Sequence, residues 1–260
     1  MKIMKRMLIW SRNILLFLFL SSILLVFAYK FIPVYYTPLM FIRLYEQVRD
    51  GKSLKLDHTW VPLSEIAQVL PQAVVASEDN LFLDHNGFDI QQIQKARKEA
   101  VRGKRVRGAS TITQQTAKNV FLWPGKSYIR KGIEAYFTVL IEWVWGKERI
   151  MEVYLNSIEM GDGIYGAEAI AKTNFKKSAR QLTRSNAALI AATLPNPRRF
   201  NSAKPSPYML KRQHKIQSLM GKLIKIEMGY GAGKTDGDSK PKKRKKWRAD
   251  ANVEIKNIRA

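Results

Sequence analysis

The feature that most constrains this chain is a run of sixteen uncharged residues, Ile14 to Tyr29, which reads ILLFLFLSSILLVFAY. As a helix rising ~1.5 Å per residue, the run covers about 24 Å, somewhat less than a hydrocarbon core of ~30 Å. Lys30 can extend its charge towards the headgroups, and Phe31 and Ile32 lengthen the apolar stretch. The sequence therefore predicts one transmembrane anchor, over residues 13–34.

Charge on one side of this run predicts its orientation. Four basic residues precede it: Lys2, Lys5, Arg6 and Arg12. Because basic residues stay on the cytoplasmic side, residues 1–12 should be cytoplasmic and the chain after the anchor should lie on the outer side of the membrane. A cleaved signal peptide is the alternative, since Val26-Phe27-Ala28 resembles a cleavage site. The run exceeds the usual ~7–15 apolar residues of such a peptide, so we favour a retained single-pass anchor.

The whole chain is strongly basic, with 45 Lys and Arg against 21 Asp and Glu and a formal net charge of +24. This balance favours an anionic partner, with nucleic acid, anionic lipid and a phosphorylated substrate all open. The last segment, residues 229–260, begins GYGAGKTDGDSKPKKRKKWR and is predicted to be a disordered basic tail. In the orientation above the tail would lie outside the cytoplasm, so lipid headgroups or anionic wall polymers fit it better than nucleic acid.

Between the anchor and the tail, apolar residues recur at helical spacing. Helices are expected over residues 39–48, 63–74, 90–101, 127–145, 150–158, 167–175 and 183–194. Asp89 and Ser127 are expected to cap two of them, and Gly103 to end the third. No alternating strand pattern of useful length is visible. The sequence predicts one mostly α domain over residues 35–228.

The first polar cluster follows an apolar helix. Glu78 and Asp79 are adjacent carboxylates, with Phe82 and His85 shortly after them. A carboxylate at the mouth of a helical domain can be a general base when its neighbours hold it in place. The alternative is that Asp79 and Asp84 cap turns and that His85 packs in the core.

The second cluster reads RGASTITQQTAKN, from Arg107 to Asn119, and contains no carboxylate. If a helix begins at Ser110, one side of it would carry Ser110, Thr111, Gln114, Gln115 and Lys118. Free N–H groups and the positive dipole end of that helix would lie beside Arg107, which suits a phosphate or sugar hydroxyls. The alternative is a solvated polar face.

Two further clusters are less specific. Arg130 and Lys131 precede Glu134, which is either a plain i,i+4 ion pair or a second carboxylate flanked by cations and facing the same cleft as Glu78. The fourth cluster runs from Lys147 past Asn156 to Gly166, and it combines helix packing with a glycine-rich turn.

Five segments together resemble a known family. They read EDNLFLDHNGFD, RGASTITQQTAKN, RKGIE, ERIMEVYLNSIEMGDGIYGAEA and LTRSNAALIAATLPNP, in that order. In these segments the chain resembles the peptidoglycan glycosyltransferases of family 51, over roughly Trp60 to Pro205. It is most similar to the monofunctional, membrane-anchored form. No transpeptidase is expected, because the chain holds no Lys-Thr-Gly and has no length for such a domain.

The resemblance implies a lysozyme-like, mostly α domain with a small membrane-facing jaw lobe, preceded by one transmembrane helix. It implies an enzyme that polymerises lipid II into β-1,4-linked glycan strands by an inverting mechanism and releases undecaprenyl diphosphate. The expected partners are lipid II, the growing glycan strand and inner membrane lipids, with cell-wall synthases or division proteins as candidates and no nucleic acid. No cofactor is required, and a divalent Mg or Mn at Glu134 is left open.

The resemblance also implies roles for residues. Glu78 would take the proton from the 4-hydroxyl of the acceptor sugar, and Glu134 would assist departure of the lipid diphosphate. The substrate-binding candidates are Asp79, Phe82, His85, Arg107, Ser110, Thr111, Gln114, Gln115, Lys118, Lys126, Arg130, Lys131 and Asn156. The chain departs from the family pattern at three positions: Ile133, Asn174 and Asn186.

Two rival interpretations remain at this point. A lytic hydrolase of similar fold would also carry two carboxylates, although it would not need a membrane anchor. A non-enzymatic membrane protein would use the basic run from Lys240 to Arg248 to bind nucleic acid or anionic lipid.

Overall fold

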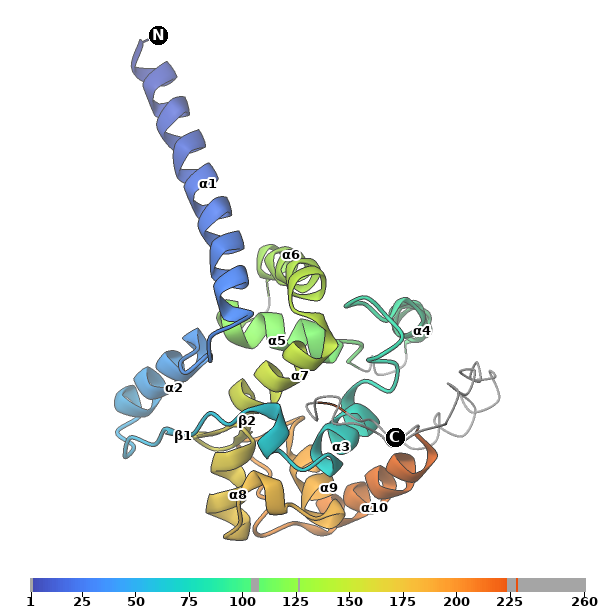
Figure 1. Ribbon diagram of the computed structural model, residues 1–260. Coiled ribbons are helices and arrows are strands. Elements are labelled where there is room, and N and C mark those ends of the chain that lie inside the picture. Colours follow the sequence, from blue (N-terminus) through green and yellow to red (C-terminus); the bar gives the residue numbers. More distant parts are fainter. Residues whose placement is uncertain (1, 104–107, 126, 224–227, 229–260) are drawn as a thin grey trace, which may run out of the picture. The chain divides into compact units, whose positions relative to one another are not determined.

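The computed structural model describes residues 2–103, 108–125, 127–223 and 228. Arg107, Lys126 and the predicted tail over 229–260 lie outside the described residues. Within them the predicted mostly α fold is confirmed, because helices connected by short turns account for most of the chain (Figure 1).

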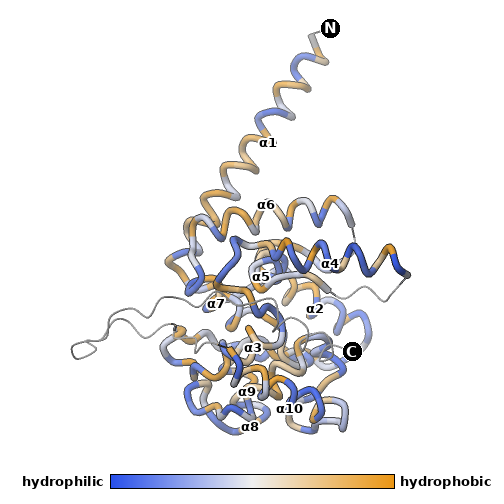
Figure 2. The backbone as a smooth tube through the Cα atoms, turned by 90° about the vertical axis from the view of Figure 1, so that its right-hand side faces the viewer, coloured by the Kyte–Doolittle hydropathy of each residue, from blue (hydrophilic) through white to orange (hydrophobic). Residues whose placement is uncertain are grey.

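The first helix, α1, spans Lys2–Tyr29. Its 28 residues cover about 42 Å, and the stretch Ile3–Tyr29 is long and apolar enough to cross a membrane. Figure 2 shows that hydrophobic residues dominate the helix beyond its basic first turns. The helix starts earlier than residue 13 and stops before residue 34, so the basic residues predicted to flank the anchor lie on the helix itself.

The C-terminal turns of α1 are bonded to later helices. The indole Nε1 of Trp145 donates a hydrogen bond to the carbonyl of Val26 at 2.7 Å. The hydroxyls of Ser22 and Tyr136 are 2.8 Å apart, and the guanidinium of Arg149 donates to the carbonyl of Tyr29 at 2.8 Å. These bonds fix the end of the apolar helix to the rest of the fold.

The next helix, α2, spans Pro38–Arg49. It begins at Thr37, whose hydroxyl accepts from the amide of Met40, and Pro38 occupies the first turn, where its missing N–H costs nothing. The predicted amphipathic helix is confirmed, although its buried residue is Met40 and Val48 is exposed.

One group of helices forms the part of the core that carries Glu78. These are α3 (Val69–Glu78), α9 (Arg184–Thr193) and α10 (Pro207–Lys222), and α9 packs against both of the others. The run expected from Leu63 divides into a short 3-10 turn, Leu63–Glu65, and α3, because Ile66 adopts an extended conformation between them. No helix was predicted over the residues of α10.

A second group surrounds α5, which spans Ile112–Phe121. It packs against α6 (Tyr128–Val144) and α7 (Gly146–Ser157), and the rings of Phe121 and Phe137 stack at 4.3 Å. The helix α4 (Ile90–Val101) has no buried residue and begins, as predicted, at Asp89, whose carboxylate accepts from the amide of Gln92 at 2.9 Å.

A small sheet completes the fold, although no strand was predicted. The strands β1 (Asp57–His58), β2 (Glu159–Gly161) and β3 (Ile164–Tyr165) lie in the order β1-β3-β2, with β3 parallel to β1 and antiparallel to β2. Gly163 turns the β2–β3 hairpin at φ +67°, where a Cβ would lie 2.6 Å from the carbonyl of Lys55. The helix α8 (Ala167–Phe175) and a 3-10 turn (Ala179–Gln181) follow the sheet.

Candidate active site

Glu78 is the last residue of α3, and its position is set by the core because residues 70, 71 and 73–76 of that helix are buried. Its side chain remains 15% exposed. One carboxylate oxygen accepts from the hydroxyl of Ser77 at 2.9 Å and lies 3.7 Å from the guanidinium of Arg212. The other accepts from the amide of Gln115 at 3.3 Å. An oriented carboxylate with an open edge meets the geometric requirement for a general base.

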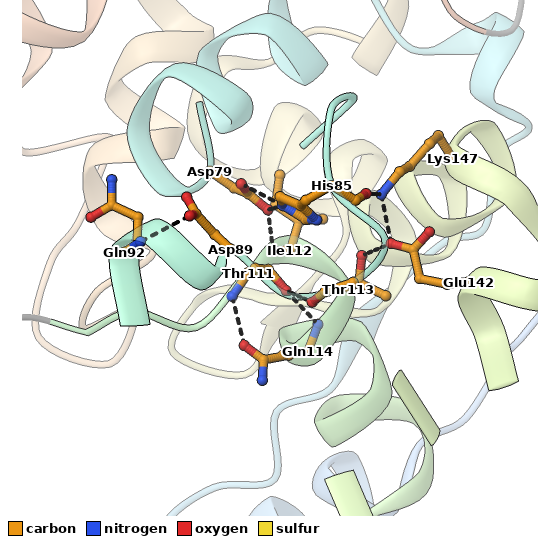
Figure 3. A network of polar contacts seen from close by, with 11 residues as sticks. Asp79, His85, Asp89, Gln92, Thr111, Ile112, Thr113, Gln114, Glu142 and Lys147 are labelled. Atoms are coloured by element: carbon orange, nitrogen blue, oxygen red, sulfur yellow. Dashed lines mark hydrogen bonds and ion pairs between the residues drawn. The ribbon is translucent and has the colours of Figure 1, made fainter. Parts of the chain in front are cut away.

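The neighbouring carboxylate, Asp79, is engaged inside the protein. Both of its oxygens lie 3.0 Å from Nε2 of His85, and one also accepts from the backbone amide of Ile112 at 3.0 Å (Figure 3). Asp79 thereby ties the end of α3 to the beginning of α5. Asp79 and His85 were predicted as substrate contacts, but in this conformation each side chain is buried against the other.

The polar stretch after Gly108 folds differently from the expected single polar face. The helix begins at Ile112 rather than at Ser110, because Thr111 and Gln114 form a reciprocal capping box. The hydroxyl of Thr111 also donates to the carbonyl of Gly87 at 2.6 Å. Thr111 and Gln114 are therefore buried and stabilise the helix start, whereas Ser110 precedes the helix and is exposed. The predicted shared face is wrong for these two residues.

A second buried contact supports the same region. Glu142 of α6 accepts from the hydroxyl of Thr113 at 2.6 Å and from the ammonium of Lys147 at 2.6 Å. Lys147 also donates to the carbonyl of His85 at 2.6 Å, as Figure 3 shows. This ion pair joins α6, α5 and the segment after α3, so it holds in place the backbone that carries Glu78.

Two side chains of α5 remain available to a substrate: Gln115 and Lys118, both partly exposed. Gln115 bridges Glu78 and the hydroxyl of Tyr154, which donates to its carbonyl oxygen at 3.2 Å. Burial raises the pKa of Tyr154, so this phenol stays protonated and remains a donor. Burial lowers the pKa of Lys118, the nearby Glu134 raises it, and the cations around it lower it further.

Glu134 lies in α6 between two cations. One of its oxygens accepts from the guanidinium of Arg130 at 2.8 Å, and the other pairs with the ammonium of Lys131. Arg130 is anchored in addition by the carbonyl of Gly125 at 2.8 Å. The Glu134 side chain is 3% exposed and that of Lys131 is 48% exposed, whereas Arg130 is buried, so Lys131 is the member of this cluster that is accessible to a ligand.

The two carboxylates border the same face of α5. Gln115 donates a hydrogen bond to Glu78, and the negative charge of Glu134 raises the pKa of Lys118. Residues three apart on a helix have Cβ atoms about 5–6 Å from one another. This arrangement supports the predicted convergence of Glu78 and Glu134 on one site, with an uncharged amide at one end and cations at the other.

Two other substrate-binding candidates have no exposed surface. Phe82 packs in the core, with the ammonium of Lys147 4.7 Å from the centre of its ring. Asn156 accepts from the amide of Val61 at 3.0 Å and donates to the carbonyl of the same residue at 2.9 Å. Both side chains stabilise the fold in this conformation, and Arg107 and Lys126 lie outside the described residues.

Sequence reasoning missed two residues of the site, Arg212 and Tyr154. Arg212 lies on α10 and donates to the hydroxyl of Ser77 at 3.1 Å, so it reaches Glu78 both directly and through that hydroxyl. A usable signal was present, because Ser206 followed by Pro207 is a strong start for a helix. Tyr154 could be found only by placing α7 against α5.

The three departures from the family pattern have local explanations. Asn186 accepts from the amide of Thr183 at 3.1 Å and completes a capping box at the start of α9. Asn174 donates to the hydroxyl of Ser202 at 2.8 Å. Ile133 is partly buried on α6 beside Glu134 and adds no charge there.

Glu134, the residue left open as a metal ligand, has both carboxylate oxygens engaged within the protein. Each oxygen of Glu134 is already paired with a cationic side chain. In the part of the chain that the structure describes, no group of three His, Cys, Asp or Glu residues is placed to hold a metal. The cationic side chains of Arg130 and Lys131 lie close enough to Lys118 to lower its pKa.

Comparisons with known proteins identify the family of this chain. A family model described as Transglycosylase matches residues 46–221. A "Biosynthetic peptidoglycan transglycosylase" of Bacteroides thetaiotaomicron is 57% identical over 93% of this chain and 97% of its own length. Proteins with the same description from Bdellovibrio bacteriovorus and Caulobacter vibrioides are 53% and 52% identical over 80% and 81% of this chain, and 83% and 91% of their own lengths. The chain belongs to the transglycosylase family, and it is an enzyme that transfers glycosyl groups.

Proposed function

We propose that this protein polymerises lipid II into β-1,4-linked glycan strands and releases undecaprenyl diphosphate. The observation that carries the proposal is the division of the site along α5, with the oriented carboxylate of Glu78 beside Gln115 and the cations beside Lys118. The description of the relatives as peptidoglycan transglycosylases supports the choice of peptidoglycan as the product.

In the proposed reaction Glu78 accepts the proton of the acceptor sugar's 4-hydroxyl while that oxygen bonds to the anomeric carbon of the donor. Gln115, held by Tyr154, keeps the carboxylate turned towards the substrate. Ser77 donates to the opposite oxygen and Arg212 forms an ion pair with it at 3.7 Å, which leaves one edge of the carboxylate for the proton. The attack opposite the α-linked diphosphate gives a β linkage without a covalent enzyme intermediate.

The bond from the anomeric carbon to the diphosphate breaks in the same step, and the leaving group carries its electron pair away as an anion. No proton is needed for this departure, because diphosphate is a stable anion. Lys118, Arg130 and Lys131 offset the charge that develops there. Glu134 holds two of these cations in position, so its proposed role is to orient the cations.

The transmembrane anchor would hold the site close to a substrate that is embedded in the bilayer. The end of α1 is bonded to α6 and α7, and two exposed apolar side chains of α6, Ile129 and Trp143, are 76% and 84% accessible. We propose that the N-terminus is cytoplasmic and the catalytic domain lies on the outer side of the inner membrane, as the basic residues before the apolar run indicate.

The test is purified full-length protein with labelled lipid II, with and without moenomycin, the phosphoglycolipid inhibitor of this family. The proposal predicts a glycan polymer and released undecaprenyl diphosphate, both suppressed by moenomycin. Shortening of preformed glycan strands, with lipid II left unchanged, would instead support the lytic alternative. No activity on either substrate would contradict both.

A further inference from the structure

An exposed aromatic pair lies outside the site described above. Tyr208, in the first turn of α10, is 57% exposed. Its ring centre is 5.7 Å from that of Phe200, a half-buried residue of the loop before α10, and the two rings are inclined by 31°. Large apolar side chains that gather at the surface of a protein often mark a binding site. The two rings together offer a ligand an apolar surface.

This pair adjoins the catalytic carboxylate. Tyr208 and Arg212 are four residues apart on α10, so they lie on the same side of the helix. Arg212 is 3.7 Å from the carboxylate of Glu78. One helical turn, ~5.4 Å along the axis, therefore separates the aromatic pair from a residue of the site. A polymer held at Glu78 can cover both positions.

A lysine completes this surface. Lys211 lies three residues after Tyr208, which makes the two side chains neighbours on α10. It is exposed, and within the described part of the chain no carboxylate pairs with it. We call Phe200, Tyr208 and Lys211 the α10 edge. This edge presents two rings and one available ammonium group beside the cation of Arg212.

The part of the chain that carries the α10 edge is strongly basic. Residues 167–223 contain twelve Lys and Arg and a single acidic residue, Glu168, whereas residues 35–166 contain seventeen basic and fifteen acidic residues. Glu168 is already paired with Lys172 at 3.0 Å. An excess of one sign of charge raises the local concentration of oppositely charged ligands. The charge therefore favours an anionic ligand, and the aromatic pair favours one that also has an apolar surface.

We infer that the α10 edge binds the peptidoglycan strand beside Glu78, with a sugar ring packed on Phe200 and Tyr208 and a carboxylate of the attached peptide at Lys211. Such a strand has both properties, because the C–H faces of its sugars are apolar and its peptides end in carboxylates. A simple anion would leave the rings without a partner, and an apolar lipid chain would leave the lysine without one. The inference rests on the proposed function, which makes this strand the product.

The experiment measures the affinity of the full-length protein, in detergent, for soluble uncrosslinked peptidoglycan strands. Tyr208→Ala should weaken this affinity about tenfold, through loss of one aromatic packing contact, and Tyr208→Phe should retain it. Strands that Tyr208→Ala makes from lipid II should be shorter, because a product that is bound more weakly dissociates sooner. The replaced side chain is largely exposed, so the unfolding temperature should not change.

Lys211 is tested with a second ligand, the same strands after enzymatic removal of their peptides. Lys211→Glu should weaken the binding of intact strands about tenfold at low salt and leave the binding of peptide-free strands unchanged. The matched control is Lys177→Glu, because Lys177 is also exposed and has no acidic partner within the described residues. It lies after α8, outside the α10 edge, and the same change of charge there should leave both affinities unchanged.

Unchanged strand affinity in Tyr208→Ala would overturn the inference. An equal loss in Lys177→Glu would also overturn it, as would an equal loss for peptide-free strands in Lys211→Glu. Polyglutamate is a further probe, because it carries carboxylates without sugars. If Tyr208→Ala weakened its binding as much as that of the strands, the surface would be a general polyanion site and the inference would be wrong. Polymerisation of lipid II by the unaltered protein tests the proposed function separately, and none of these outcomes alters that result.

Discussion

Replacing Glu134 by Gln should damage both stability and catalysis, and the structure allows each effect to be sized. The substitution removes the negative charge that faces Arg130, which is 10% exposed, while the amide keeps one acceptor. Loss of a buried charged hydrogen bond costs about 1.5–3 kcal/mol. The pair with Lys131, whose side chain is 48% exposed, contributes less than about 1 kcal/mol. The free energy of unfolding should fall by roughly 2–4 kcal/mol in all.

The catalytic effect of Glu134→Gln should exceed what this destabilisation explains. With the cations no longer held in place, polymerisation should slow by about 10²-fold, the magnitude typical for loss of one preorganised electrostatic contact. The assay is the initial rate of lipid II polymerisation, measured well below the unfolding temperature. Glu168→Gln is the matched control, because Glu168 is also a buried carboxylate paired with a lysine four residues later on a helix.

Equal polymerisation rates for Glu134→Gln and Glu168→Gln would refute the reasoning, because the loss of rate would then follow from the loss of stability alone. If added magnesium restored the polymerisation rate of Glu134→Gln, the proposed role of the cations would also be refuted, because a metal would then be the principal partner of the leaving group. Thermal unfolding of both variants should show comparable losses, of about 2–4 °C per kcal/mol for a domain of this size.

Three further outcomes are expected. Because burial lowers the pKa of Lys118, the polymerisation rate should decline on the alkaline side at a lower pH than titration of an ordinary lysine would give. Lys118→Arg should shift this decline to higher pH. If the pH–rate profile of Lys118→Arg shows no such shift, Lys118 is not the group that causes the decline. Arg212→Ala should lower kcat about tenfold with little change in KM, because it positions Glu78, and an altered KM alone would contradict this. Thr111→Val should lower the free energy of unfolding by about 1 kcal/mol in a denaturant titration, whereas Ser110→Ala should leave it unchanged. Equal losses of unfolding free energy in the two variants would contradict a capping role for Thr111.

Helices with strong apolar spacing and clear caps could be predicted from the sequence. The expected start at Asp89 and the segment from Ser127 to Trp145 agree with α4 and α6, although the side chain of Ser127 makes no capping hydrogen bond within the described residues. By contrast, α10 was missed because one of its five buried positions is a glutamine, Gln213, and lysine, arginine and histidine lie between them, so its apolar stripe is interrupted. The strands were missed because two or three residues are too few for a period-2 pattern.

The residue types of the site could be predicted from the sequence, but which of them face a substrate and which stabilise the fold could be predicted less well. The start of α5 could have been placed correctly, since Thr111-Ile112-Thr113-Gln114 carries the spacing of a capping box. Whether a polar side chain faces a substrate or the core is decided by tertiary packing, as the full burial of Asn156 shows. The contribution of Arg212 depends on a contact between α10 and α3, which local sequence does not encode.

The most direct test of the account is the rate of lipid II polymerisation by Glu78→Gln, measured together with its affinity for lipid II and its unfolding temperature. The account predicts a rate reduced by about 10²–10⁴-fold, the range for loss of a general base, with binding and unfolding temperature close to those of the unaltered protein. Near-normal turnover by this variant would contradict the assignment of Glu78 as the base.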